Sequence, residues 1–125
     1  MVFHHIGIAC KNIEKEILKL KKIHSIKFQS EIVFDELQNV HLCMLTLEND
    51  FKIELVSGVT VDPFIKKGIT NYHICYETKN IDEEIEFLLS NGAILASPKK
   101  EAILFNGRQV AFLLVSYGLI EILQQ

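Results

Sequence analysis

Two stretches of this chain carry the same pattern and decide its fold. The first is His4-His5-Ile6-Gly7-Ile8-Ala9-Cys10-Lys11-Asn12-Ile13-Glu14-Lys15-Glu16-Ile17, and the second is Tyr72-His73-Ile74-Cys75-Tyr76-Glu77-Thr78-Lys79-Asn80-Ile81-Asp82-Glu83-Glu84-Ile85. They align at a constant offset of 68 (73 minus 5) and share His-Ile, Lys-Asn-Ile and a Glu-Ile pair. A repeat of this kind indicates that one structural unit occurs twice.

The repeat continues toward the end of each copy. The run 40–45 aligns with 110–115 at an offset of 70, and 52–55 aligns with 119–122 at an offset of 67. Loops of different length absorb these changes in offset. We therefore predict that the chain is one domain built from two copies of a half-domain.

The same order of secondary structure is predicted in both copies. Runs with a period of two predict opening strands at 2–9 and 71–77. Asn12 and Asn80 are N-cap residues for the amphipathic helices that follow. Three more strand-like runs complete each copy, at 26–34, 40–47 and 51–57, then at 93–97, 108–116 and 118–124. We expect an α+β fold in which two tandem βαβββ modules form a curled, half-open mixed sheet around a metal site.

Length and composition set the limits of this domain. A chain of 125 residues suits one domain, 1–125, with module one at 1–58, a linker at 59–70 and module two at 71–125. The 49% hydrophobic content and the net charge of -3 exclude disorder, and the apolar runs are too short for a membrane helix. A pI near 5.9 without a basic stripe argues against a nucleic-acid partner.

Cysteine usage points to a reducing compartment. Cys10, Cys43 and Cys75 form no C-x-x-C pair, and each lies in an apolar run. We expect buried, reduced thiols. The N-terminus shows no basic region followed by an apolar one, so the cytoplasm is the expected location.

Four side chains recur at matching places in the two copies. His5 and His73 lie in the opening strands, and Glu54 and Glu121 lie in the closing strands. Taken alone, Glu54 would be expected to face solvent, and His5 would be expected to be a hydrogen-bonded core histidine. Because both residue types repeat, we predict that the four converge on one divalent ion such as Zn, Ni, Co, Mn or Fe, with water in the open positions.

The other three histidines are predicted to lie outside this site. His4 precedes His5, so strand alternation turns it to the opposite face, where a packing or surface role is expected. His24 and His41 have no counterpart in the other copy and are expected to be surface or packing residues.

Several motifs resemble the vicinal oxygen chelate superfamily. They are 4–9, 35–40, 53–56, 72–77 and 118–122, which together cover nearly the whole chain. That superfamily contains glyoxalases, methylmalonyl-CoA epimerases, extradiol dioxygenases and bleomycin-resistance proteins, and the His-Ile-Gly-Ile-Ala opening is most similar to the epimerase branch. The resemblance implies paired βαβββ modules and a divalent metal held by one residue from each of four strands. Those ligands fall on the four residues that the repeat singles out: His5, Glu54, His73 and Glu121.

One departure from the epimerase pattern concerns a second proton-transfer group. In epimerases an acidic residue precedes a Gln-Gly-Val step, whereas this chain has Leu37 before Gln38-Asn39-Val40. Glu36 stands one residue earlier, where alternation sends it to the other side unless a bulge or turn redirects it. The departure puts two-base epimerisation in question and leaves the metal ligands unchanged.

The expected chemistry is proton abstraction next to a metal-chelated carbonyl. A metal-dependent epimerase or isomerase-type lyase would use Glu121 as both ligand and base, and no organic cofactor is expected. A small molecule such as an acyl-CoA, for example methylmalonyl-CoA, is the candidate substrate, with Lys66, Lys67 and Arg108 as candidates for its phosphates. We expect a homodimer without a nucleic-acid or membrane partner.

Three alternatives use the same fold. One is a glyoxalase-type lyase, although no glutathione-binding pattern is present. Another is a non-catalytic, resistance-type binding protein, which would not need all four ligands. The last is an oxygenase, which is the least favoured because four protein ligands leave fewer open positions on iron.

Overall fold

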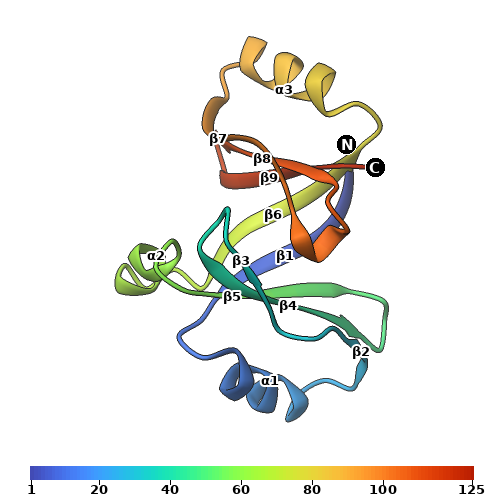
Figure 1. Cartoon of the computed structure of the whole chain (residues 1–125), viewed down its shortest axis with the longest axis vertical. Helices are drawn as coiled ribbons and strands as arrows, with labels where there is room; N and C mark the ends of the chain where they lie inside the picture. Colours follow the sequence, from blue (N-terminus) through green and yellow to red (C-terminus); the bar gives the residue numbers. More distant parts are fainter. The chain divides into compact units, whose positions relative to one another are not determined.

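The computed structural model describes residues 1–125, and it divides into two compact units. The first unit is His5–Tyr72, and the second is Met1–His4 together with His73–Gln125. Each contains a sheet with one long helix on it (Figure 1). The predicted α+β class with tandem βαβββ modules is confirmed.

The first unit is built on strands that pair in the order β2-β4-β5-β1. Its elements are β1 (Val2–Ala9, of which the residues from His5 onward belong here), α1 (Ile13–Lys21), β2 (Ile26–Gln29), β3 (Val33–Asp35), β4 (Val40–Leu47), β5 (Lys52–Ser57) and α2 (Asp62–Lys66). β1 and β5 are parallel, and β3 also pairs with β4. Helix α1 packs Ile13 and Ile17 onto one sheet face, against residues that include Leu45 and Leu55.

The second unit repeats this plan with strands in the order β6-β9-β8-β7. Its elements are β6 (Asn71–Thr78), α3 (Ile81–Ser90), β7 (Ile94–Glu101), a 3-10 turn η1 (Ile103–Phe105), β8 (Gln109–Val115) and β9 (Gly118–Gln124). β6 and β9 are parallel. Helix α3 packs Ile81 and Leu88 against Leu113 and Ile122. One face of each sheet is therefore covered by its own helix, and polar residues on the strands point to the other face.

Both helix starts are capped as predicted. The Asn12 side chain accepts a hydrogen bond from the Lys15 backbone N–H at 2.9 Å, and Asn80 accepts one from Glu83 at 3.2 Å. Helix α3 ends at Ser90 and is followed by Gly92 at φ +96°, a conformation that glycine adopts without strain. The caps satisfy backbone donors that the first helical turn cannot pair internally.

Three predicted segments differ from the structure. The run 26–34 is two strands, because Ser30 lies between them and its hydroxyl accepts a hydrogen bond from the Met44 N–H at 2.8 Å. The strand expected at 93–97 continues to Glu101. The linker 59–70 contains helix α2, whose first turn includes Pro63, a residue favoured at that position.

Strand pairing corrects one part of the internal alignment. Met44 lies opposite Glu54 in the first unit, and Phe112 lies opposite Glu121 in the second. Met44 and Phe112 are therefore equivalent, at an offset of 68 (112 minus 44), so the offset of 70 for this strand is wrong by two residues. A shift of two leaves every side chain on the same face, so the alternating pattern could not reveal it.

Two further findings bear on the sequence predictions. All three cysteines are free and buried, as expected. Burial and the nearby Glu16 raise the pKa of the Cys10 thiol to about 11, which makes it a poor nucleophile.

None of the helices is both long and apolar enough to span a membrane.

Candidate metal site

The first unit places His5 and Glu54 together. Ile53 and Leu55 pack against the α1 side of the sheet, so Glu54 between them points to the opposite face. Parallel pairing sets Gly7 of β1 beside Glu54, and His5 lies two residues before Gly7 on the same face. His5 Nε2 lies 3.6 Å from Glu54 Oε1, and the two residues are only 0% and 4% exposed.

The second unit builds the same pair from β6 and β9. The parallel register sets Cys75 beside Glu121, and His73 lies two residues before Cys75. His73 Nε2 lies 3.3 Å from Glu121 Oε1, and both residues are buried. The Phe112 ring meets the His73 imidazole edge-on, with centroids 5.4 Å apart and planes at 87°. This contact limits the rotation of the His73 ring.

Each pair has the chemistry of a half-site for a divalent ion. Donors about 2.1 Å from a shared metal in tetrahedral or octahedral geometry lie roughly 3.0 to 3.4 Å apart. The separations of 3.6 and 3.3 Å are near that range and longer than the usual N–H···O hydrogen bond. A carboxylate buried in an apolar sheet also needs a positive partner. Imidazole and carboxylate donors therefore fit a divalent cation in both units.

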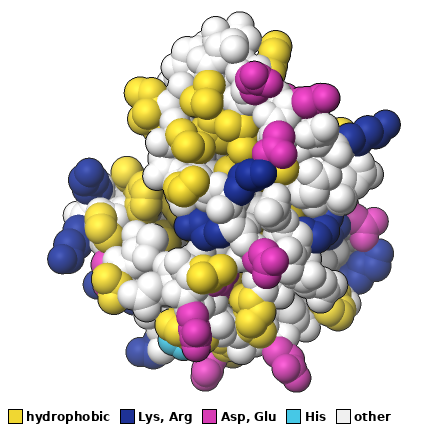
Figure 2. Space-filling view, turned by 45° about the horizontal axis from the view of Figure 1, so that its top comes forward, with side chains coloured by type: hydrophobic (Ala, Val, Ile, Leu, Met, Phe, Trp, Pro, Cys, Tyr) yellow, Lys and Arg dark blue, Asp and Glu magenta, His cyan; other side chains and the backbone are white.

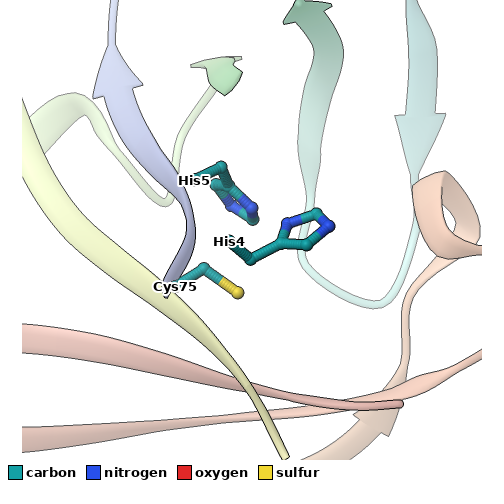
Figure 3. Close-up of side chains that lie close together, drawn as sticks. All are labelled: His4, His5 and Cys75. Carbon is teal, nitrogen blue, oxygen red and sulfur yellow. The ribbon is translucent and has the colours of Figure 1, made fainter. Parts of the chain in front are cut away.

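The other histidines contact neighbouring side chains. The half-buried His4 ring packs edge-on against Phe105 at 5.8 Å, and Figure 3 shows it near Cys75 of β6. His24 Nδ1 lies 3.4 Å from a carboxylate oxygen of Glu48 near the surface. The His41 ring packs on Phe34 at 4.9 Å. These contacts agree with the packing and surface roles predicted for them.

The segment after β3 is a turn organised by a residue that the sequence did not single out. Asp35 is buried, and its carboxylate accepts hydrogen bonds from the Leu37 and Gln38 backbone N–H groups and from the Gln38 side chain. Glu36 and Leu37 are exposed on this turn. Asn39 takes the left-handed conformation (φ 54°) at the place where the epimerase pattern has glycine. The buried Asp35 carboxylate therefore stabilises this turn through its hydrogen bonds.

Arg108 is already engaged within the second unit. Its guanidinium donates to Glu77 at 2.9 Å and to the Gln124 carbonyl at 3.3 Å, and it lies over the Phe105 ring. These contacts give it a structural role in linking β6, β9 and η1. They weaken its case as a phosphate ligand.

Comparison with known proteins identifies the class. A family model described as Glyoxalase/Bleomycin resistance protein/Dioxygenase superfamily matches residues 4–112. The chain belongs to this superfamily, and the resemblance seen in the sequence is confirmed. A search of curated proteins finds no match.

Solved structures share the fold at low sequence identity. A methylmalonyl-CoA epimerase from Mycobacterium tuberculosis matches with a TM-score of 0.82 and 16% identity, over 98% of this chain and 87% of that chain. A Streptomyces coelicolor methylmalonyl-CoA epimerase, in complex with 2-nitronate-propionyl-CoA, matches with a TM-score of 0.74 and 18% identity, over 98% and 93% of the two chains. A hypothetical protein from Bacillus halodurans matches with a TM-score of 0.74 and 26% identity, also over 98% and 93%.

Proposed function

We propose that the chain is a metal-dependent epimerase or isomerase-type lyase that removes a proton next to a chelated carbonyl. The observation that carries this proposal is the duplicated, buried His–Glu pair at equivalent strand positions of the two units. The repeat and the family together favour one shared divalent ion, held by His5, Glu54, His73 and Glu121. An acyl-CoA such as methylmalonyl-CoA is the proposed substrate.

The proposed roles follow from the side-chain chemistry. A bound divalent ion would supply positive charge beside the substrate carbonyl and make the adjacent C–H more acidic. His5, His73 and Glu54 would hold the ion, and Glu121 would be both a ligand and the base that accepts the proton. Phe112 positions the His73 ring. All four side chains are buried, which strengthens their electrostatic interactions with a bound cation.

A single base is proposed. Leu37 stands where epimerases have a second acidic group, and Glu36 lies exposed on the turn that Asp35 organises. With Glu121 alone, proton removal and return on one face of the substrate retain its configuration, and inversion requires the planar enolate to turn over or to take a proton from solvent on its other face. We therefore expect exchange of the acidic proton to be faster than inversion of the carbon.

Metal analysis of the purified chain tests the site. We expect one equivalent of Zn, Ni, Co or Mn per chain, and loss of that ion in His5→Ala and in His73→Ala. Two ions per chain would show that each His–Glu pair binds separately. No bound transition metal in protein refolded with each ion would overturn the proposal.

Deuterium exchange tests the reaction. A single enantiomer of methylmalonyl-CoA in D2O should gain deuterium at the α-carbon, which mass spectrometry measures. Deuterium incorporation should be faster than racemisation of the α-carbon. A metal-loaded protein that exchanges no acyl-CoA, but converts the hemithioacetal of methylglyoxal and a thiol, would be a glyoxalase-type lyase instead. Binding of ligand with neither reaction would make it a resistance-type binding protein.

Assembly and location complete the proposal. We infer a homodimer from the family resemblance, to be measured by light scattering on the eluting protein. The three free, buried thiols are consistent with the proposed cytoplasmic location.

A further inference from the structure

The first unit contains a groove that the proposed metal chemistry does not use. It encloses about 370 Å³ between the start of α1 and the segment that follows α2. Figure 1 shows the β1–α1 connection and α2 on the same side of this unit. One wall is formed by α1 with its preceding loop, and the opposite wall includes Ile65 and Ile69.

The helix wall of the groove is basic. Lys11, Lys15 and Lys19 line it; Lys15 and Lys19 lie one turn apart on α1, and Lys11 lies in the loop that precedes the helix. None of the three forms an ion pair, whereas Lys27 is bound to Asp50 at 2.6 Å. Glu16 is the single acidic residue among the lining side chains. The basic side chains that project on the left of Figure 2 lie on the side of α2, not of α1, in Figure 1.

The second unit shows that the module does not need Lys15 and Lys19. At the offset of 68, Lys15 corresponds to Glu83 and Lys19 to Phe87. The first turn of α3 is acidic, with Asp82, Glu83 and Glu84. Lys11 has a basic counterpart in Lys79, whereas Lys15 and Lys19 have none on α3, so the βαβββ plan forms without these two helix lysines.

We propose that this groove binds the phosphate groups of an adenine-nucleotide ligand. Three ammonium groups without acidic partners suit two or more phosphates, because lysine binds phosphate through a compact positive charge. Ile65 and Ile69 offer an apolar wall for the base. Lys66 and Lys67 are exposed on α2 and at its end, and they do not line the groove.

Two sources supply this chemistry. One is a free nucleotide. The other is the nucleotide end of an acyl-CoA, an assignment that rests on the proposed function. Ala9 lines the groove and lies four residues after His5 on β1, which is about 13 Å at the usual strand rise. The pantetheine arm of CoA separates the acyl carbonyl from the phosphates. An acyl-CoA could therefore place its phosphates in the groove and its carbonyl near His5.

Calorimetric titration of the metal-free full chain tests the groove. We expect 3′,5′-ADP or ATP to bind with an affinity that falls as salt is raised, and adenosine to bind much more weakly. Lys15→Gln/Lys19→Gln should weaken nucleotide binding by about tenfold or more. Lys21→Gln/Lys22→Gln is the matched control, since it removes two charges beyond the groove, and it should change binding less than about twofold.

The outcomes separate the two sources and the two proposals. Preference for 3′,5′-ADP over ATP supports the CoA source, and equal binding or preference for ATP supports a free nucleotide. Binding that persists in His5→Ala supports a site independent of the metal, whatever the metal analysis shows. Absence of nucleotide binding, or equal loss in both lysine pairs, would overturn the groove proposal and leave the metal proposal standing.

Discussion

The two units share a buried His–Glu pair and differ in what surrounds it. Beside Glu54 the neighbouring strand has Gly7, whereas beside Glu121 it has Cys75. Across the antiparallel pairing, Met44 lies opposite Glu54 and Phe112 lies opposite Glu121. The imidazole–carboxylate pair is thus common to both units, while its packing is particular to each. The proposed metal chemistry therefore requires the His–Glu pair, and the module tolerates different neighbours around it.

The largest expected difference between the units concerns catalysis. Glu121→Gln should lower the exchange rate by about 10³-fold at saturating metal, because it removes both the proposed base and a ligand charge. Glu54→Gln should act mainly through metal affinity, with most of the exchange rate restored by excess metal. Metal titration and deuterium incorporation measure both effects. Equal losses at saturating metal would contradict the division of roles.

Core substitutions test the corrected alignment. Leu45 and Leu113 are fully buried and equivalent by strand register. Replacing either with alanine should cost about 2 to 4 kcal/mol of unfolding free energy, because each leaves a cavity. Val115 is the partner of Leu45 in the sequence alignment, and it is only half-buried, so Val115→Ala should cost about 1 kcal/mol. Urea denaturation gives all three values, and a Val115 cost equal to that of Leu45 would favour the sequence alignment.

Two glycines of positive φ, one in each unit, separate crowding from backbone strain. A Cβ on Gly58 (φ +133°) would meet the Asn39 carbonyl oxygen at 2.9 Å, whereas a Cβ on Gly118 (φ +122°) would meet nothing within 4 Å. Gly58→Ala should therefore destabilise the chain by about 1 to 2 kcal/mol more than Gly118→Ala. Thermal unfolding of both variants measures the difference. Similar shifts would show that the turn around Asn39 moves to make room.

The smallest expected difference is between the helix caps. Asn12→Ala should cost about 1 kcal/mol through loss of the bond to Lys15. Asn80→Ala should cost less, because Gln124 accepts a hydrogen bond from the Ile81 N–H at 2.9 Å and holds the start of α3 from outside. Asn→Asp at each position keeps the acceptor and is the control. A larger cost at Asn80 would show that Gln124 does not compensate.

Local signals in the sequence were sufficient for much of the fold. The caps at Asn12 and Asn80 and the order of the strands depend on neighbours within a few residues, and these predictions are confirmed. Helix α2 was missed although Pro63 was a usable signal. The break at Ser30 could not be foreseen, because it depends on a hydrogen bond to Met44 on another strand.

The sequence by itself determined that two copies of one module each carry a histidine on an opening strand and a glutamate on a closing strand. That information lies in side-chain identity and repeats along the chain. Only the tertiary structure decided which residues meet: His5 with Glu54 and His73 with Glu121. It also decided that Cys75 and Phe112 stand beside the second pair, and that three lysines line a groove in the first unit. The physical reason is that a strand pattern of period two specifies the face of each side chain, and only the pairing of strands specifies its neighbour.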